Sequence, residues 1–294
     1  MRRESVVTGI AFVLLSSVVF APVVQACSKY LLLAFPLVQV MWVRSAGHAL
    51  WMVVIFWPTH GLGMFKTKRP GLQFARSVLL SGCSLAWLLA IPHVQLASAA
   101  AIMFTTPMFV ALLSIPMLGE RVGMHRFGAI VVGFVGVLIV IRPGSSEMVT
   151  EMLFIVFAAL QYALYQILTR KVSVDDSAAT SAVYAVAAGA VCVSFFVPFD
   201  YRIPGADDWP QWLALFAISF VGGFRHLLMV KAFEHAPASV VSPFCYTELI
   251  GVSLLGVLMF SELPDSWTWV GAAVIVASGL YIAHRESRSA KVDN

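Results

Sequence analysis

The stretch ASAAAIMFTTPMFVALLSIPMLGERV at residues 97–122 returns later in the chain as APASVVSPFCYTELIGVSLLGVLMFSELP at residues 236–264. The two stretches align through an alanine-serine pair near the start and a glutamate near the end, Glu120 in the first and Glu262 in the second. The offset of 142 residues between these glutamates is close to half of the 294-residue chain. The sequence therefore indicates an internal duplication that covers most of the chain.

The composition of the chain is typical of a membrane protein. Apolar residues make up 60% and charged residues 12% of the sequence, and the mean hydropathy is +0.88. Soluble domains average about 45–50% apolar and about 25% charged residues, so this composition excludes a soluble enzyme and a disordered protein. The apolar runs are continuous rather than alternating, which excludes a β-barrel and predicts helices of about 20 residues that span the bilayer.

Ten such runs, separated by charged residues, Pro or Gly, predict an all-α integral membrane protein. We expect the spans at about residues 6–26, 31–57, 73–91, 96–118, 124–141, 150–168, 178–198, 211–233, 239–260 and 266–284. Each half, residues 1–145 and 146–294, then holds five spans. Because five is odd, the second half must cross the membrane in the opposite orientation. Inverted repeats are typical of secondary transporters, whose substrate site lies near the bilayer midplane where the repeats meet.

Lysines and arginines set the predicted orientation. With both termini in the cytoplasm, 14 of the 19 Lys and Arg residues fall on the inner side, Arg76 among them. The outer side keeps only Lys29, Arg142 and Arg202. This bias predicts a multi-pass protein of the inner (plasma) membrane with cytoplasmic ends. It also accounts for the pI near 9.0 without a nucleic-acid partner.

The first 26 residues leave one alternative open. Two arginines precede an apolar run that ends shortly before Cys27, a pattern that resembles a cleavable secretory or lipoprotein signal. We prefer a first transmembrane helix, because Gln25 fits poorly before a cleavage site and the next apolar run begins at once, at Leu31.

Several segments resemble the EamA-like family of the drug/metabolite transporter superfamily. The segments that carry this resemblance are Pro107, Leu118-Gly119-Glu120, the run from Gly128 to Val137, APASVVSPF at 236–244, FSELPD at 260–265 and WVGAAVIVASGLYI at 269–282. The resemblance implies a ten-helix inverted-repeat carrier that is not an enzyme. It implies metabolite substrates such as amino acids, S-adenosylmethionine, vitamins such as riboflavin, or drugs, and leaves importer and exporter open.

Three charged residues lie deep within predicted spans: Arg44, Arg225 and Glu248. A charge at the bilayer centre costs about 2.5–3.5 kcal/mol on insertion scales, so each needs a partner, water or a function. In the functional interpretation, Arg44 and Arg225 face a central cavity and hold a carboxylate or phosphate of the substrate, which the planar guanidinium binds bidentately. In the alternative, an arginine pairs with Glu248 and locks two helices together.

Glu248 is also a candidate for proton coupling. If a substrate occupies the arginine beside it in one state only, the carboxylate binds a proton more readily in that state. The chain would then be a proton-linked importer or exporter. The alternatives are a static ion pair in a metabolite exchanger, or a channel-like pore without proton coupling.

Four further polar residues are candidates for the wall of the substrate site. His48 lies one helical turn after Arg44 and shares its face. Gln161 and Tyr165 share a face of the sixth span, and Tyr246 lies in the ninth. The aromatic rings would stack on a heterocyclic substrate. The simpler alternatives are helix bridging for the histidine and packing or an interfacial belt for the tyrosines.

Glu120 and Glu262 each follow a span at the membrane surface. Capping of a helix terminus is the simpler interpretation for them, and gating is the alternative. Pro107 and Pro243 lie within corresponding spans of the two halves and predict helix kinks.

No residue pattern indicates a cofactor or a metal. The four cysteines, Cys27, Cys83, Cys192 and Cys245, are scattered, without a CxxC or Cys/His cluster. The chain contains no P-loop, which excludes transport driven by its own ATP hydrolysis. The expected partners are a small-molecule metabolite and membrane lipid, and a homodimer is left open.

Overall fold

The computed structural model describes residues 3–119, 123–143, 149–236 and 238–292, and the elements in these ranges are helices. The first half holds α1 (Arg3–Leu14), the π-helical η1 (Leu15–Phe20), α2 (Ala21–Leu32), α3 (Leu37–His60), η2 (Gly61–Phe65), α4 (Pro70–Ala90), α5 (Leu96–Met103), α6 (Thr106–Leu118) and α7 (Met124–Ile141). The second half holds α8 (Val149–Val172), α9 (Ala178–Ser194), η3 (Val197–Phe199), α10 (Trp209–His235), α11 (Ala238–Val241), η4 (Ser242–Thr247), α12 (Glu248–Phe260) and α13 (Ser266–Val292).

Nine stretches of these helices are long and apolar enough to span a membrane, and the shorter apolar helix Phe127–Ile141 makes a tenth in the described ranges. They follow the predicted order of spans along the chain. The prediction of an all-α membrane protein with ten transmembrane helices is therefore confirmed. The first span, Val6–Leu32, is a single stretch of 27 residues formed by α1, η1 and α2.

Lys29 lies in a helix rather than in the outer loop predicted for it. It belongs to the last turn of α2 and is buried. Helix α2 extends further than its apolar run, because buried polar partners replace the water that the charged side chain would otherwise need. Arg76, near the start of the predicted span 73–91, lies in the second turn of α4 with 1% of its surface exposed.

The fourth span of each half is interrupted at corresponding positions. In the first half α5 ends at Met103 and α6 begins at Thr106, directly before Pro107. In the second half the 3-10 segment η4, which contains Pro243, separates α11 from α12, whose first residue is Glu248. Proline lacks the N–H group of a regular helical hydrogen bond and clashes with the preceding turn. The break therefore places the N-terminus of α12 inside the bundle.

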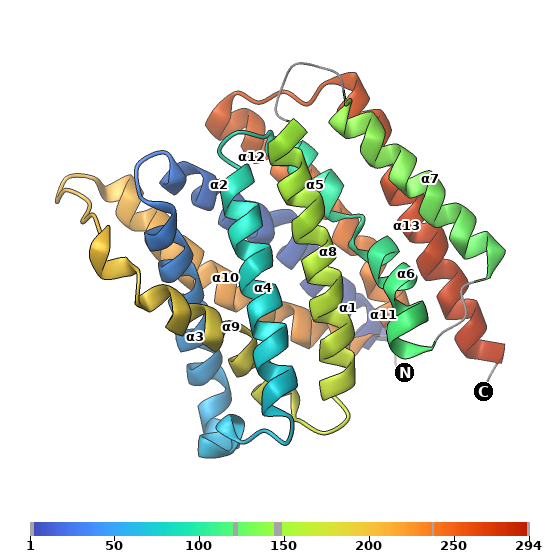
Figure 1. The fold of residues 1–294 in the computed structure, drawn as a ribbon, viewed down its shortest axis with the longest axis horizontal. Helices are drawn as coiled ribbons and strands as arrows, with labels where there is room; N and C mark the ends of the chain where they lie inside the picture. Colours follow the sequence, from blue (N-terminus) through green and yellow to red (C-terminus); the bar gives the residue numbers. More distant parts are fainter. Residues whose placement is uncertain (1–2, 120–122, 144–148, 237, 293–294) are drawn as a thin grey trace.

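Helices of the two halves alternate in space and do not form separate lobes. Figure 1 shows α4 beside α8 and α7 beside α13, and these pairs share the most extensive packing in the bundle. The α7–α13 crossing depends on glycine. A Cβ atom on Gly271 would lie 2.8 Å from the backbone oxygen of Gly136, and one on Gly136 would lie 3.0 Å from the oxygen of Gly271.

We predict that Gly271→Ala destabilises the α7–α13 contact. The added methyl group would also lie 2.5 Å from a Val140 side-chain carbon, and overpacking of this kind costs about 1–3 kcal/mol. Thermal unfolding of the purified protein should show a lower midpoint. Gly128→Ala is the matched control, because a Cβ there has no neighbour within 4 Å. An equal loss in both variants would contradict the close crossing.

Candidate functional site

Two arginines and one glutamate from three helices come together inside the bundle. Arg44 lies in α3, Arg225 in α10, and Glu248 begins α12. The Nη2 atom of Arg225 lies 3.5 Å from Oε2 of Glu248, whose side chain is 13% exposed. The charges of Arg44 and Arg225 also interact with each other. The three embedded charges thus form one group with members from both halves, which we call the central cluster.

Gln25 holds the other oxygen of the same carboxylate. Its side-chain amide donates a hydrogen bond to Oε1 of Glu248. Because Gln25 lies in α2, the carboxylate joins the first span to α10 and α12. Gln25 was not among the predicted site residues. Its one signal in the sequence is an amide inside a 27-residue apolar span.

Tyr162 and Cys83 complete the surroundings of the central cluster. The Tyr162 phenol lies within electrostatic range of Arg225 and Glu248, and the Cys83 thiol lies within electrostatic range of Arg44. These residues come from α8 and α4. Helices of both halves therefore surround the cluster, at the junction where inverted-repeat carriers bind their substrates.

The central cluster has unmatched hydrogen-bonding capacity. Its two guanidinium groups and one carboxylate leave a formal excess of one positive charge. Among the described residues, Arg44 has no hydrogen-bond or ion-pair partner, and the buried Arg225 Nε and Gln25 Oε1 have no hydrogen-bond partner. An anionic group would satisfy the guanidinium N–H groups, and a donor on the same ligand would satisfy the Gln25 oxygen.

The helix break stabilises the carboxylate in this position. Glu248 occupies the first turn of α12, where the backbone N–H groups have no partner within the helix. The positive end of the helix dipole favours a negative charge there. The corresponding residue of the first half is Thr106, whose hydroxyl donates to the Met103 carbonyl at 2.7 Å. The negative charge is therefore a property of the second half alone.

His48 bridges two helices. Its Nε2 lies 3.2 Å from the Ile218 carbonyl oxygen of α10. The imidazole fills a notch at Gly222, where an added Cβ would lie only 1.8 Å from Nε2. The imidazole is buried, with 7% of the residue exposed. These contacts favour the bridging alternative for His48, and they hold α3 and α10 in the register that brings Arg44 near Arg225.

Gln161 and Tyr165 lie along α8 beside the central cluster. Gln161 packs against Gly82 of α4, and its buried Oε1 has no hydrogen-bond partner in the described part of the chain. Tyr165 stacks on Tyr162 with a centroid distance of 5.6 Å. Tyr246 is directed elsewhere: its ring packs edge-on against Phe104, and its hydroxyl lies against α13 at the position of Gly279.

Arg76 is a buried arginine that the sequence analysis did not single out. Its guanidinium donates to Gln73 Oε1 at 2.7 Å and to the Ser181 carbonyl at 2.8 Å. It also donates to the Tyr165 hydroxyl at 3.2 Å and lies 5.0 Å from the centre of that ring. Gln73 in turn donates to Asp176 Oδ2 at 2.8 Å. A polar chain therefore runs from Tyr165 to the connection between α8 and α9.

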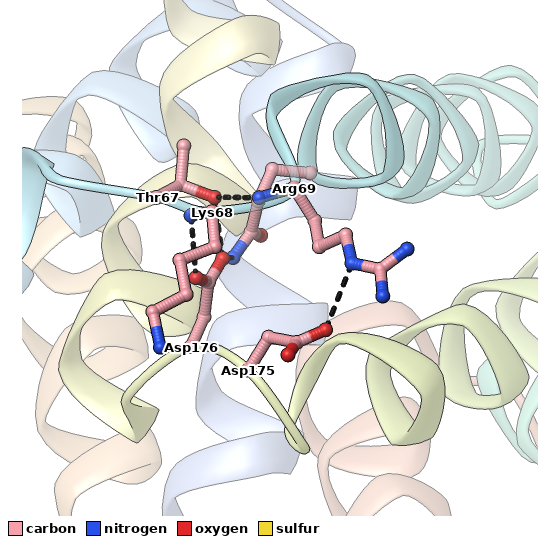
Figure 2. Close-up of polar contacts among 6 residues, drawn as sticks. Thr67, Lys68, Arg69, Asp175 and Asp176 are labelled. Atoms are coloured by element: carbon pink, nitrogen blue, oxygen red, sulfur yellow. Dashed lines mark hydrogen bonds and ion pairs between the residues drawn. The ribbon is translucent and has the colours of Figure 1, made fainter.

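Asp176 is the anchor of that connection. Figure 2 shows it beside Thr67 and Lys68, while Asp175 faces Arg69. The Lys68 backbone N–H donates to Asp176 Oδ1 at 2.8 Å, and the Thr67 hydroxyl donates to Oδ2. Burial alone would raise the pKa of Asp176, but these hydrogen bonds and the one from Gln73, together with the Lys68 charge, lower it below its ordinary value of 3.8.

We predict that Asp176→Asn lowers the stability of the protein at neutral pH. Because the pKa of Asp176 is lowered on folding, the ionised carboxylate stabilises the fold above pH 3.8, and this contribution is lost as the pH falls through the folded pKa. Losing the charge from these hydrogen bonds costs about 1 kcal/mol at a partly exposed site. Thermal unfolding at several pH values should show the two proteins converging below pH 3.8.

Asp175→Asn is the matched control for this experiment. Asp175 pairs with Arg69 at 2.8 Å, but the Arg69 side chain is 57% exposed, and exposed ion pairs contribute little. A larger loss in Asp175→Asn than in Asp176→Asn would contradict the anchoring role of Asp176.

No group of three or more His, Cys, Asp or Glu side chains in the described residues is placed to hold a metal ion. The guanidinium, carboxylate and amide groups of the central cluster can bind a ligand through ionic and hydrogen-bonded contacts.

Comparisons with known proteins identify the family and the fold. The profile of the EamA-like transporter family matches residues 7–142 and, a second time, residues 149–283. An S-adenosylmethionine uptake transporter of Rickettsia prowazekii is 27% identical, over 97% of this chain and 96% of its own. A riboflavin transporter of Vibrio cholerae is 29% identical, over 96% and 95%. A protein of known crystal structure, 16% identical, matches 98% of this chain and 99% of its own with a TM-score of 0.63, which shows a shared fold.

Proposed function

We propose that this chain, which belongs to the EamA-like transporter family, carries a metabolite with an amino-acid head group through the central cluster. The family and the names of the relatives identify a small-molecule membrane transporter rather than an enzyme. The observation that carries the proposal is the pairing of unsatisfied guanidinium groups with a carboxylate and an amide oxygen in one buried site.

The two ends of an amino-acid head group match the two kinds of unsatisfied atoms. A carboxylate would bind between Arg44 and Arg225, since arginine recognises carboxylates through paired N–H donors. An ammonium would bind the Gln25 oxygen and the Glu248 carboxylate. Of the two compounds in the relatives' names, S-adenosylmethionine has both groups and riboflavin has neither. The stacked rings of Tyr162 and Tyr165 offer an aromatic surface for a nucleobase beside the head group.

The orientation we propose has both termini in the cytoplasm and the chain in the inner (plasma) membrane. Apart from the buried Lys29 and Arg76, the described lysines and arginines counted on the inner side lie in the connection between η2 and α4 or toward the helix ends predicted to be cytoplasmic. The Asp176 connection is then cytoplasmic and the end of the bundle with Lys29 is periplasmic. Two halves of opposite orientation provide two related states that expose the central cluster to either side.

We predict that S-adenosylmethionine raises the unfolding temperature of the purified protein and that riboflavin does not. Arg44→Ala should weaken the binding of S-adenosylmethionine about 10- to 100-fold, the loss expected for a charge-assisted hydrogen bond of about 1.5–3 kcal/mol. Titration by thermal shift and counterflow in proteoliposomes would measure this. Arg202→Ala is the matched control, because that side chain is 65% exposed in a connection outside the cluster.

Stabilisation by riboflavin alone, or equal binding by the Arg44 and Arg202 variants, would contradict the assignment of a carboxylate to Arg44. Saturable counterflow would support a carrier, whereas fluxes far above carrier rates would indicate a channel-like pore.

The same site offers a route to proton coupling through Glu248. Arg225 and Gln25 both contact the carboxylate, and Tyr162 and Cys245 lie within electrostatic range. Because the substrate ammonium would bind the same carboxylate, it would compete with a proton for Glu248, and binding of one would displace the other. Substrate and proton would then occupy the site in alternation.

We predict that Glu248→Gln abolishes the pH dependence of transport and the accumulation of substrate against a gradient, while exchange continues. Uptake into proteoliposomes at several pH values, with and without an imposed proton gradient, would measure both. Glu151→Gln is the matched control at the start of α8. If Glu248→Gln keeps the pH dependence and the accumulation of the parent protein, Glu248 is a static partner of Arg225.

A further inference from the structure

A second buried ion pair lies at the end of the bundle where α2 ends. Lys29, in the last turn of α2, pairs with Glu262, and their side chains are 4% and 19% exposed. The Lys29 ammonium also donates to the Val94 carbonyl at 2.7 Å and lies 5.2 Å from the centre of the Phe260 ring. Lys29 therefore links α2 to the connection before α5 and to the connection after α12.

Glu262 also caps a helix, but not the one that follows it. Its Oε2 accepts a hydrogen bond at 3.1 Å from the backbone N–H of Leu96, the first residue of α5. The next helix, α13, has its own cap, since Asp265 accepts from the Thr268 N–H at 2.8 Å. Glu262 of the second half thus contacts two segments of the first half, α2 through Lys29 and α5 through Leu96. Its counterpart in the repeat, Glu120, lies outside the described residues.

An apolar layer separates this ion pair from the central cluster. The layer consists of Ala26, Leu96, Ala100 and Val252, with Leu249, Leu255 and Phe260 packed against them. On α2 the two polar levels are one helical turn apart, because Gln25 and Lys29 differ by four residues, or about 6 Å of rise.

The two ends of the bundle are closed to different degrees. At the end with Lys29, α12 packs against α5. The repeat equivalents of these segments at the opposite end are η4 and α6, and over the described residues they share no comparable packing. Among the described segments, this pair of repeat equivalents therefore packs more closely on the side of Lys29.

We propose that the Lys29–Glu262 pair is the latch of this end and must break before the central cluster opens toward it. The proposal rests on the proposed function, because a latch presupposes a site that opens to alternate sides. For a buried ion pair, the attraction gained is largely offset by the hydration lost. An intact pair can therefore separate into water reversibly. When only one partner is present, the remaining ion favours the open state, where water reaches it.

Thiol labelling of Cys83 measures this opening without any substrate. Cys83 lies beside Arg44 in the central cluster and is 7% exposed. With the other three cysteines replaced by alanine, a membrane-impermeant maleimide is applied to each side of right-side-out and inverted vesicles. The labelling rate is proportional to the fraction of molecules that are open toward the reagent. Lys29→Met and Glu262→Gln should each raise this fraction, and with it the labelling rate from the side of Lys29, about tenfold.

The double variant Lys29→Glu with Glu262→Lys restores the attraction with reversed charges and should bring labelling back toward the parental rate. Arg142→Met is the matched control. It breaks a more exposed ion pair at this end, Arg142–Asp265 at 2.6 Å, whose side chains are 43% and 39% exposed and which joins the residue after α7 to the residue before α13. Labelling of Cys83 in this variant should equal that of the parent.

Unchanged labelling in folded Lys29→Met and Glu262→Gln proteins overturns the latch, and so does an equal rise in Arg142→Met. If Lys29→Met does not fold, Glu262→Gln and the charge reversal decide the matter. The result does not depend on the substrate. If the Lys29 and Glu262 variants label faster but the protein binds no amino-acid metabolite, the latch stands and the proposed function fails. If labelling is unchanged but a metabolite binds in an Arg44-dependent way, the latch fails and the proposed function stands.

Discussion

The burial of one carboxylate inside an apolar bundle is the constraint on which the arrangement of the helices depends. An ionised Glu248 at this depth must be paired and hydrogen-bonded. Its partners are the guanidinium of Arg225 at 3.5 Å and the amide of Gln25. These partners come from α10 and α2, and Glu248 itself begins α12, so satisfying one charge draws both halves of the chain together.

The repeat is symmetric in its backbone and asymmetric in its chemistry. Both halves interrupt the fourth helix at the same point, and Thr106 and Glu248 occupy equivalent positions. The threonine hydroxyl is satisfied by a carbonyl one turn before it in its own chain segment, whereas the carboxylate needs partners from other helices. The two halves therefore share a backbone arrangement, while a few residues without a counterpart in the other half make the chemistry of the central cluster asymmetric.

Sequence reasoning finds residues whose signal is local and misses those whose partners are distant. Hydropathy locates the spans, and Arg44, Arg225 and Glu248 stand out because charges are rare there. Gln25 is uncharged, and its partner is 223 positions away. Closeness in sequence is an equally incomplete guide: Tyr246 is two residues from Glu248, but its ring packs against Phe104 and its hydroxyl lies against α13.

Lys29 and Arg76 were missed for a related reason: near the end of a span, a basic residue is indistinguishable from the positive-inside signal. What separates a structural basic residue from one at the membrane surface is its burial, and burial depends on tertiary packing. Lys29 is buried because a carbonyl, a carboxylate and an aromatic face converge on it from two connections. No periodicity along α2 encodes that convergence, and only the assembled bundle brings the three groups together.

The position of α2 connects the binding site to the closure of the bundle. Gln25 contacts Glu248, and Lys29, one turn further along the same helix, contacts Glu262. A helical turn is rigid, so a shift of α2 that releases one contact also strains the other. The π-helical segment η1 precedes α2, and such segments often mark sites of function. Gly251 lets α12 approach η1 closely, because an added Cβ would lie 2.2 Å from the Val18 carbonyl oxygen. In the proposed mechanism, occupancy of the central cluster and opening at Lys29 would therefore be linked through α2, which begins at an irregular turn.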